Sequence, residues 1–99
     1  MWYMVLGEDH DASLEKRKRA RPAHLERMRA MLDDGRLLLA GPLPAADSVE
    51  PGPAGFTGSL VIVDFPSLEE ARAWAADDPY CAAGVYKSIT VKPFIKVLP

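Results

Sequence analysis

Along this chain, segments with a strand-like pattern of apolar residues alternate with segments that have a helix-like pattern. Four segments rich in leucine, aromatic and β-branched side chains are typical of buried or half-buried strands: 2–7, 36–42, 59–65 and 86–97. Two segments between them repeat apolar residues every three or four positions, as amphipathic helices do: 22–34 and 67–76. The order of these elements predicts a β-α-β-β-α-β chain.

Capping residues mark where the helices begin and end. Ser67 and Glu70 form an S-x-x-E capping box at the start of the second helix. Gly35 suits the C-terminal end of the first helix. Proline lacks the backbone N–H that a helix interior needs, so we expect a short turn at 13–19 and a main helix that begins at Pro22.

This element order is the ferredoxin-like pattern of an α+β fold, an antiparallel sheet with both helices on one face. Neighbouring strand positions are apolar, so one layer of helices cannot cover all of them. A second sheet is the natural cover, and we expect a homodimer whose two sheets close face to face towards a barrel. Pro93 in the last strand predicts an edge, a bulge or a subunit boundary.

Composition limits the remaining possibilities. Ninety-nine residues, 48% of them hydrophobic, predict a single domain (1–99) with a real core. A net charge of −2 gives no overall attraction to nucleic acid or to an anionic membrane. No segment has the length of a membrane span and the N-terminus lacks a signal-peptide pattern, so we expect a cytoplasmic protein. One cysteine and two histidines in unlike contexts predict no metal and no bound cofactor.

Two residues are candidates for acid–base chemistry. His24 lies at the margin of the apolar face of the first helix, where it is either a buried structural histidine or a general acid or base. Asp78 precedes Pro79 and suits the N-cap of a one-turn helix that ends at Gly84. A capping carboxylate keeps spare acceptor sites, so Asp78 could also orient an imidazole. Their separation of 54 positions leaves open whether they meet.

Other polar segments have simpler interpretations. The basic run 16–21 is interspersed with acids and is best explained as a solvated helix face, except that Arg21 lies one turn before His24 and could bind a carboxylate. His10 and its neighbouring aspartates are best explained as a surface loop. The glycine- and proline-rich segment 41–58 predicts a long loop that forms a wall or lid, with close backbone approach but no phosphate site.

Four motifs together resemble the YciI-like family (YCII-related domain): RPAHLERM, GRLLLAGP, GFTGS and DDPY. This resemblance covers nearly the whole chain and implies a dimeric α+β barrel. It also implies a His–Asp pair as the active centre. His24 matches the histidine of the R-P-A-H-L motif and Asp78 the aspartate of the D-P-Y/F motif, although the adjacent Asp77 leaves the choice of carboxylate to the alignment.

Two functions follow as hypotheses. The first is a small cofactor-free enzyme in which His24 and Asp78 transfer a proton, giving isomerisation or elimination on a small anionic or phenolic molecule. The resemblance supports this hypothesis, because a relative is associated with dehydrochlorination of a hydroxylated aromatic and the wider fold group with muconolactone isomerisation. The second is a non-catalytic ligand-binding or interaction module that uses the same cleft. In both, the expected ligand contacts are Arg21, Gly41, Pro42, Ser59 and Tyr80.

Overall fold

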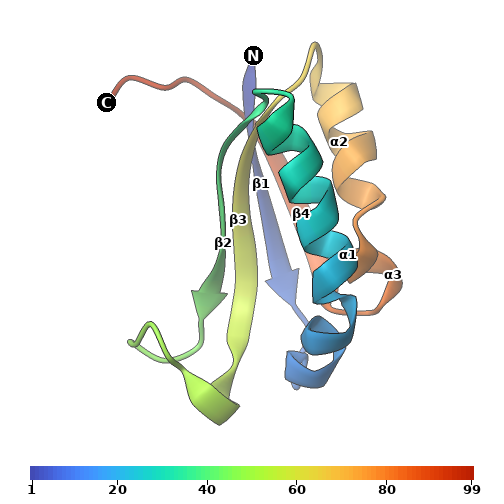
Figure 1. The fold of residues 1–99 in the computed structure, drawn as a ribbon, viewed down its shortest axis with the longest axis vertical. Coiled ribbons are helices and arrows are strands. Elements are labelled where there is room, and N and C mark those ends of the chain that lie inside the picture. Colours follow the sequence, from blue (N-terminus) through green and yellow to red (C-terminus); the bar gives the residue numbers. More distant parts are fainter.

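The computed structural model describes all 99 residues and has one four-stranded sheet with its helices on one face (Figure 1). The strands are antiparallel to their neighbours in the order β2-β3-β1-β4. This is the ferredoxin-like α+β fold that the sequence predicts. The elements along the chain are β1 (Trp2–Asp9), α1 (Leu14–Asp33), β2 (Leu37–Pro44), the 3₁₀ turn η1 (Gly52–Ala54), β3 (Phe56–Asp64), α2 (Leu68–Ala76), α3 (Pro79–Ala82) and β4 (Tyr86–Phe94).

The core lies between the sheet and the helices. Alternate residues of the two central strands point into it, and α1 contributes two methionines while α2 contributes two alanines, whose small side chains allow α2 to approach closely. The buried members of this core are Tyr3, Val5, Met28, Met31, Val61, Val63, Phe65, Ala71 and Ala75. No helix in the structure is both long enough and apolar enough to cross a membrane.

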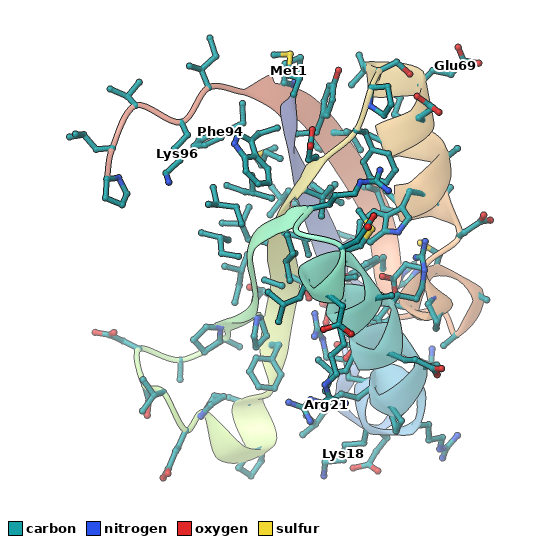
Figure 2. All side chains as sticks on the ribbon, turned by 45° about the horizontal axis from the view of Figure 1, so that its top comes forward. Met1, Lys18, Arg21, Glu69, Phe94 and Lys96 are labelled. Carbon is teal, nitrogen blue, oxygen red and sulfur yellow. The ribbon has the colours of Figure 1, made fainter.

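The opposite face of the sheet also carries apolar side chains at its centre. Because Tyr3 and Val5 point into the core, the alternating residues of β1 and their cross-strand partners point to the other side. These residues include Trp2, Met4, Leu6, Leu60, Ile62 and Phe94. Phe94 extends from the sheet away from the helices (Figure 2). No helix of this chain covers this face, so the dimeric barrel stays a prediction.

Helix α1 differs from the sequence prediction. It runs without interruption from Leu14 to Asp33, so the expected turn at 13–19 and the expected start at Pro22 were wrong. Proline has no N–H to donate to the carbonyl one turn earlier in the helix. Because Pro22 is on the exposed side of α1, that carbonyl can bond to water instead. The early turns are instead anchored from within, because Arg17 is buried and bonds to the end of β1. Tertiary contacts therefore override the local effect of proline.

The segment expected as a loop is shorter than predicted. Residues 41–44 belong to β2 and residues 56–58 to β3, and only 45–55 connect them. The close backbone approach expected near GFTGS is present, because a side chain at Gly58 would overlap the carbonyl oxygen of Gly7. Gly7 in turn leaves room for the ring of Tyr86. Pro93 lies in β4, which is an edge strand of the sheet.

Candidate active site

His24 and Asp78 form a buried hydrogen bond. One face of α1 directs His24 towards α3, whose N-cap is Asp78. The Nδ1 atom of His24 lies 2.9 Å and 2.8 Å from the two carboxylate oxygens of Asp78. The side chains of His24 and Asp78 are only 9% and 6% exposed to solvent. A carboxylate accepts hydrogen bonds, so this geometry assigns a proton to Nδ1; in the neutral imidazole, Nε2 is then the nitrogen without a proton.

Asp78 is the carboxylate of this pair, and Asp77 is not. The backbone N–H of Tyr80 donates to Asp78 Oδ1 at 2.9 Å, which is the N-cap bond of α3. The cap and the imidazole contact therefore coexist on one carboxylate. Asp77 is an exposed residue at the end of α2. Of the two aspartates, Asp78 is therefore the one that contacts His24.

Tyr80 packs between the imidazole and a cation. Its ring stacks on His24 with the centroids 4.1 Å apart and an interplanar angle of 13°. The guanidinium of Arg17 lies 4.9 Å from the centroid of the same ring. Burial raises the pKa of the Tyr80 phenol, and the positive charge of Arg17 opposes this effect only in part. The phenol is therefore neutral under ordinary conditions.

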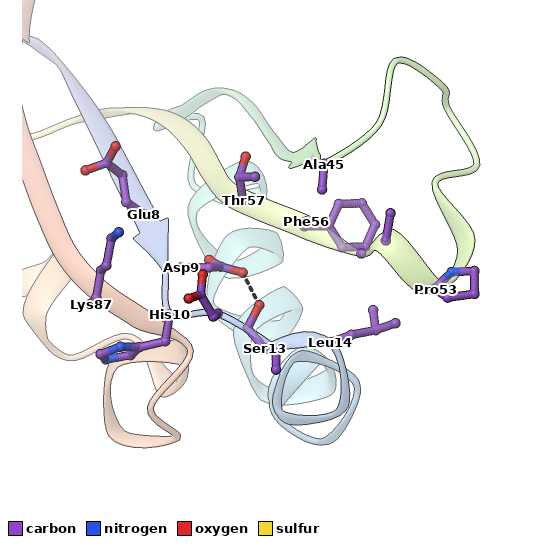
Figure 3. Close-up of a pocket in the computed structure, with 14 residues that line it drawn as sticks. Glu8, Asp9, His10, Ser13, Leu14, Ala45, Pro53, Phe56, Thr57 and Lys87 are labelled. Carbon is purple, nitrogen blue, oxygen red and sulfur yellow. Dashed lines mark hydrogen bonds between the residues drawn. The ribbon is translucent and has the colours of Figure 1, made fainter.

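A second buried charged pair lies on the same helix face. Arg17 Nε and Nη2 donate to the two carboxylate oxygens of Asp9 at 2.6 Å and 3.0 Å. Asp9 also accepts from the Ser13 hydroxyl at 2.6 Å, a bond drawn in Figure 3. Arg17 Nη2 donates further to Ser59 Oγ at 2.8 Å. Burial lowers the pKa of Arg17, but the hydrogen bond and charge of Asp9 outweigh this and raise it, so the guanidinium is permanently charged.

Arg17 and Asp9 were not found from the sequence. The predictions of a solvated basic face for Arg17 and of a surface loop for Asp9 were wrong, because these side chains are buried. The available signal was the spacing of Arg17, Arg21, His24 and Met28, at intervals of four, three and four residues. This spacing indicates a single helix face, but the expected break at Pro22 hid it.

A cavity of about 320 Å³ joins these residues. One face of α1 forms its floor, and β2, β3 and α3 provide its walls. Six of the seven residues that the sequence predicts for the site line it: Arg21, His24, Gly41, Pro42, Ser59 and Tyr80. Asp78 does not line the cavity and contacts His24 from behind. The lining also includes Arg17 and Lys18, and Lys18 and Arg21 lie at the same end of α1 (Figure 2).

A neighbouring hollow of about 350 Å³ lies at the other side of Leu14 and Phe56, which line both spaces (Figure 3). It contains His10, Asp11 and Lys87. No three His, Cys, Asp or Glu side chains of the structure are grouped in a way that could hold a metal ion. This hollow is separate from the His24–Asp78 pair, so we treat the cavity on the α1 face as the candidate active site.

The fold and the cavity define a class: small ferredoxin-like domains that bury one histidine–aspartate pair and one arginine–aspartate pair beside a small-molecule-sized cavity. The chain belongs to the YCII-related domain family, whose model matches residues 1–95. The resemblance found in the sequence is thereby confirmed.

Individual relatives agree with this assignment. Protein YciI of Escherichia coli is 60% identical over 97 residues, which is 98% of this chain and 99% of that protein. An uncharacterized protein of Haemophilus influenzae is 50% identical over the same shares of the two chains. The solved structure of 5-chloro-2-hydroxyhydroquinone dehydrochlorinase (TftG) from Burkholderia phenoliruptrix, in complex with 2,5-dihydroxybenzoquinone, is similar in fold. Its TM-score is 0.83 at 23% identity, and the match covers 96% of this chain and 94% of that one.

Proposed function

We propose that this protein is a cofactor-free enzyme that moves a proton on a small anionic or phenolic molecule bound in the cavity on the α1 face. The observation that carries the proposal is the buried His24–Asp78 hydrogen bond beside a cavity lined by positive charge. A base needs a bare nitrogen, and the Nδ1–H of this pair leaves Nε2 as that nitrogen.

The roles of the charged residues follow from their positions. His24 Nε2 takes a proton from the ligand, and Asp78 holds the imidazole and stabilises its protonated form. Arg17 and Arg21 bind the negative charge of the ligand. Ser59 accepts from Arg17 and helps to hold its guanidinium at the wall of the cavity. Arg17 and His24 are seven residues apart on α1, a rise of about 10 Å, which suits a ligand about one ring long between two side chains.

Two proton-transfer reactions fit this arrangement. His24 removes a proton from a hydroxyl or from a carbon next to a carbonyl, and the electron pair moves into the conjugated system. In an elimination this pair expels a leaving group, such as a halide. In an isomerisation the histidine returns the proton to another carbon. TftG is a dehydrochlorinase of a chlorinated hydroxyhydroquinone according to its name, and its similar fold supports hydroxylated quinones as the first compounds to test.

A second function is a binding module without turnover. The observation that favours it is the depth of His24, which is 7% exposed and stacked under Tyr80. A structural histidine is held in the same way. In this case the cavity binds an anion through Arg17 and Arg21, and no proton leaves the ligand.

One experiment separates the two functions. Hydroxylated phenols and quinones are screened by thermal shift, and each hit is incubated in deuterated water and followed by proton NMR. An enzyme exchanges or rearranges the ligand, and His24→Ala loses this activity but keeps the fold. A hit that binds tightly to the unaltered protein and shows neither exchange nor turnover supports the binding module instead.

We also propose a homodimer formed by the open sheet face. The apolar residues of β1 and their partners on β3 and β4 support it, because no helix of this chain covers them. The interface should be of the obligate type, roughly 2,000 Å² or more in total. Light scattering should give about twice the chain mass of 10.8 kDa at micromolar concentration. A stable monomer there would refute the dimer.

A further inference from the structure

Arg27 is a partly buried cation that the proposed mechanism does not use. It lies three residues after His24 on α1, and its side chain is 23% exposed. The guanidinium lies 4.6 Å from the centroid of the Trp74 indole, and Nη2 donates to the Trp74 carbonyl at 2.6 Å. These two contacts fix the plane and the position of the charge.

The Trp74 carbonyl is available because it lies in the last turn of α2. In a continuing helix it would accept from the N–H of Asp78, but that N–H bonds to the Ala75 carbonyl instead. Arg27 therefore takes the place of a missing helical hydrogen bond. The same chain segment ends α2 and begins α3 at Asp78, so the end of α2 and the carboxylate are positioned together.

The other guanidinium nitrogen, Nη1, points towards Asp78. It is buried without a hydrogen-bond partner and lies 3.6 Å from Asp78 Oδ2. A buried cationic N–H without a partner is costly unless a negative charge lies beside it. The carboxylate of Asp78 thus has three neighbours: the backbone N–H of Tyr80, the imidazole N–H of His24 and the guanidinium of Arg27.

We infer that Arg27 is a positioning residue that balances the charge of Asp78 and thereby locks His24 in the tautomer with a proton on Nδ1 and a bare Nε2. With Arg27 in place, the buried cluster of Arg27, Asp78 and a neutral His24 has no net charge. Without Arg27, the same cluster carries one uncompensated negative charge, and uptake of a proton by Asp78 or by His24 becomes the cheapest way to remove it. Either event abolishes the resting base.

This inference rests on the proposed function for its purpose, since only a base needs a bare Nε2. Its measurement, however, requires no substrate. If Arg27 does not affect the tautomer, this inference fails, but the proton-transfer proposal is still tested separately by the exchange experiment in deuterated water. If no ligand is ever turned over, the tautomer measurement still reports on Arg27.

The test is nitrogen-15 NMR of the histidine side chains in the full chain at neutral pH. The protein has two histidines, and the exposed His10 serves as an internal reference. In the unaltered protein we expect a single His24 tautomer with a slowly exchanging Nδ1–H. In Arg27→Gln we expect either mixed tautomers or an imidazolium, with exchange of the Nδ1–H at least tenfold faster. The matched control is Arg29→Gln, which removes the same charge from an exposed position of α1 and should leave the spectrum unchanged.

A His24 spectrum of folded Arg27→Gln that equals that of Arg29→Gln would overturn the inference. If Arg27→Gln fails to fold, the double variant Arg27→Gln/Asp78→Asn decides. Removal of the carboxylate charge should restore folding, because no negative charge then lacks its partner. A double variant that is equally unfolded would show that Arg27 acts only through Trp74, and the inference would fail.

Discussion

Replacement of Asp9 by asparagine should cost the protein much of its stability. Asp9 Oδ2 accepts from Ser13 Oγ and Arg17 Nε, and Oδ1 accepts from Arg17 Nη2. An asparagine keeps one oxygen, and its NH₂ group opposes the N–H donors of Arg17. The Arg17 side chain is only 6% exposed to solvent, and its guanidinium would lose its counter-charge. Breaking one partner of a buried pair costs roughly 3–5 kcal/mol, and we expect Asp9→Asn to fall in this range.

The assay is equilibrium unfolding in urea followed by circular dichroism. A domain of this size has a stability of about 5–15 kcal/mol, so the variant should remain folded in water with a strongly reduced midpoint. Asp11→Asn is the matched control, because Asp11 is an exposed neighbour and should change stability by less than ~0.5 kcal/mol. A double variant, Asp9→Leu/Arg17→Met, should regain most of the loss, since apolar residues of similar volume often replace buried pairs without cost.

The reasoning would be refuted if Asp9→Asn lost no more stability than Asp11→Asn. That result would mean that water reaches the pair and screens it. The double variant carries a further expectation: it should fold and yet bind anionic ligands more weakly, because it lacks one of the cations that line the cavity. Full ligand binding by this variant would remove Arg17 from the proposed site.

Three other predictions concern the site and its surroundings. His24→Ala should lower turnover of any substrate by ~10²–10⁴-fold without loss of the fold. Asp78→Asn should also lower turnover but keep the helix cap, because asparagine caps helices well. Steady-state kinetics measures the turnover, and circular dichroism checks the fold. Burial raises the pKa of the Tyr86 phenol well above its ordinary 10.0. Above pH 10 the phenol therefore ionises in the unfolded state first, and the free energy of unfolding should fall by up to ~1.4 kcal/mol per pH unit. Urea unfolding at several pH values should show a weaker pH dependence for Tyr86→Phe. Gly58→Ala should destabilise by roughly 1–3 kcal/mol in the same unfolding assay, because its Cβ would overlap the Gly7 carbonyl.

The sequence predicted those elements whose signals are local. Ser67 accepts from the N–H of Glu70, as its capping box indicated, and α2 begins at the following residue. The apolar segment 59–65 lies within or directly beside β3 in the middle of the sheet. The hydrogen bond between His24 and Asp78 was also expected, but its basis was the family resemblance together with the N-cap pattern. Spacing alone could not show that two residues 54 positions apart meet.

The sequence could not predict features that depend on tertiary contacts. Pro22 is unfavourable inside an isolated helix, and only the buried contacts of Arg17 explain why α1 continues through it. In the sequence, Asp9 lies in a polar stretch after the apolar residues of the first strand, which is typical of a loop. In the structure, β1 extends as far as Asp9. The contact of Arg27 with Trp74 has no local signal in the sequence, because the free carbonyl of Trp74 is a consequence of how α2 ends.

In the proposed enzyme, helix α1 carries both an anion-binding cation, Arg17, and the base, His24, and this sets a limit on how such a site can diversify. A rigid helix holds Arg17 and His24 at a constant separation, whatever ligand is present. New ligands must therefore be accommodated by the facing wall, which is the edge strand β2. Gly41 pairs with Leu60, so a side chain added there would point to the open sheet face, whereas Ala40 and Pro42 point to the side of the cavity. Ala40 and Pro42 thus set the limit on ligand size in the proposed site, and exchanges there would change selectivity while His24 and Asp78 stay in place.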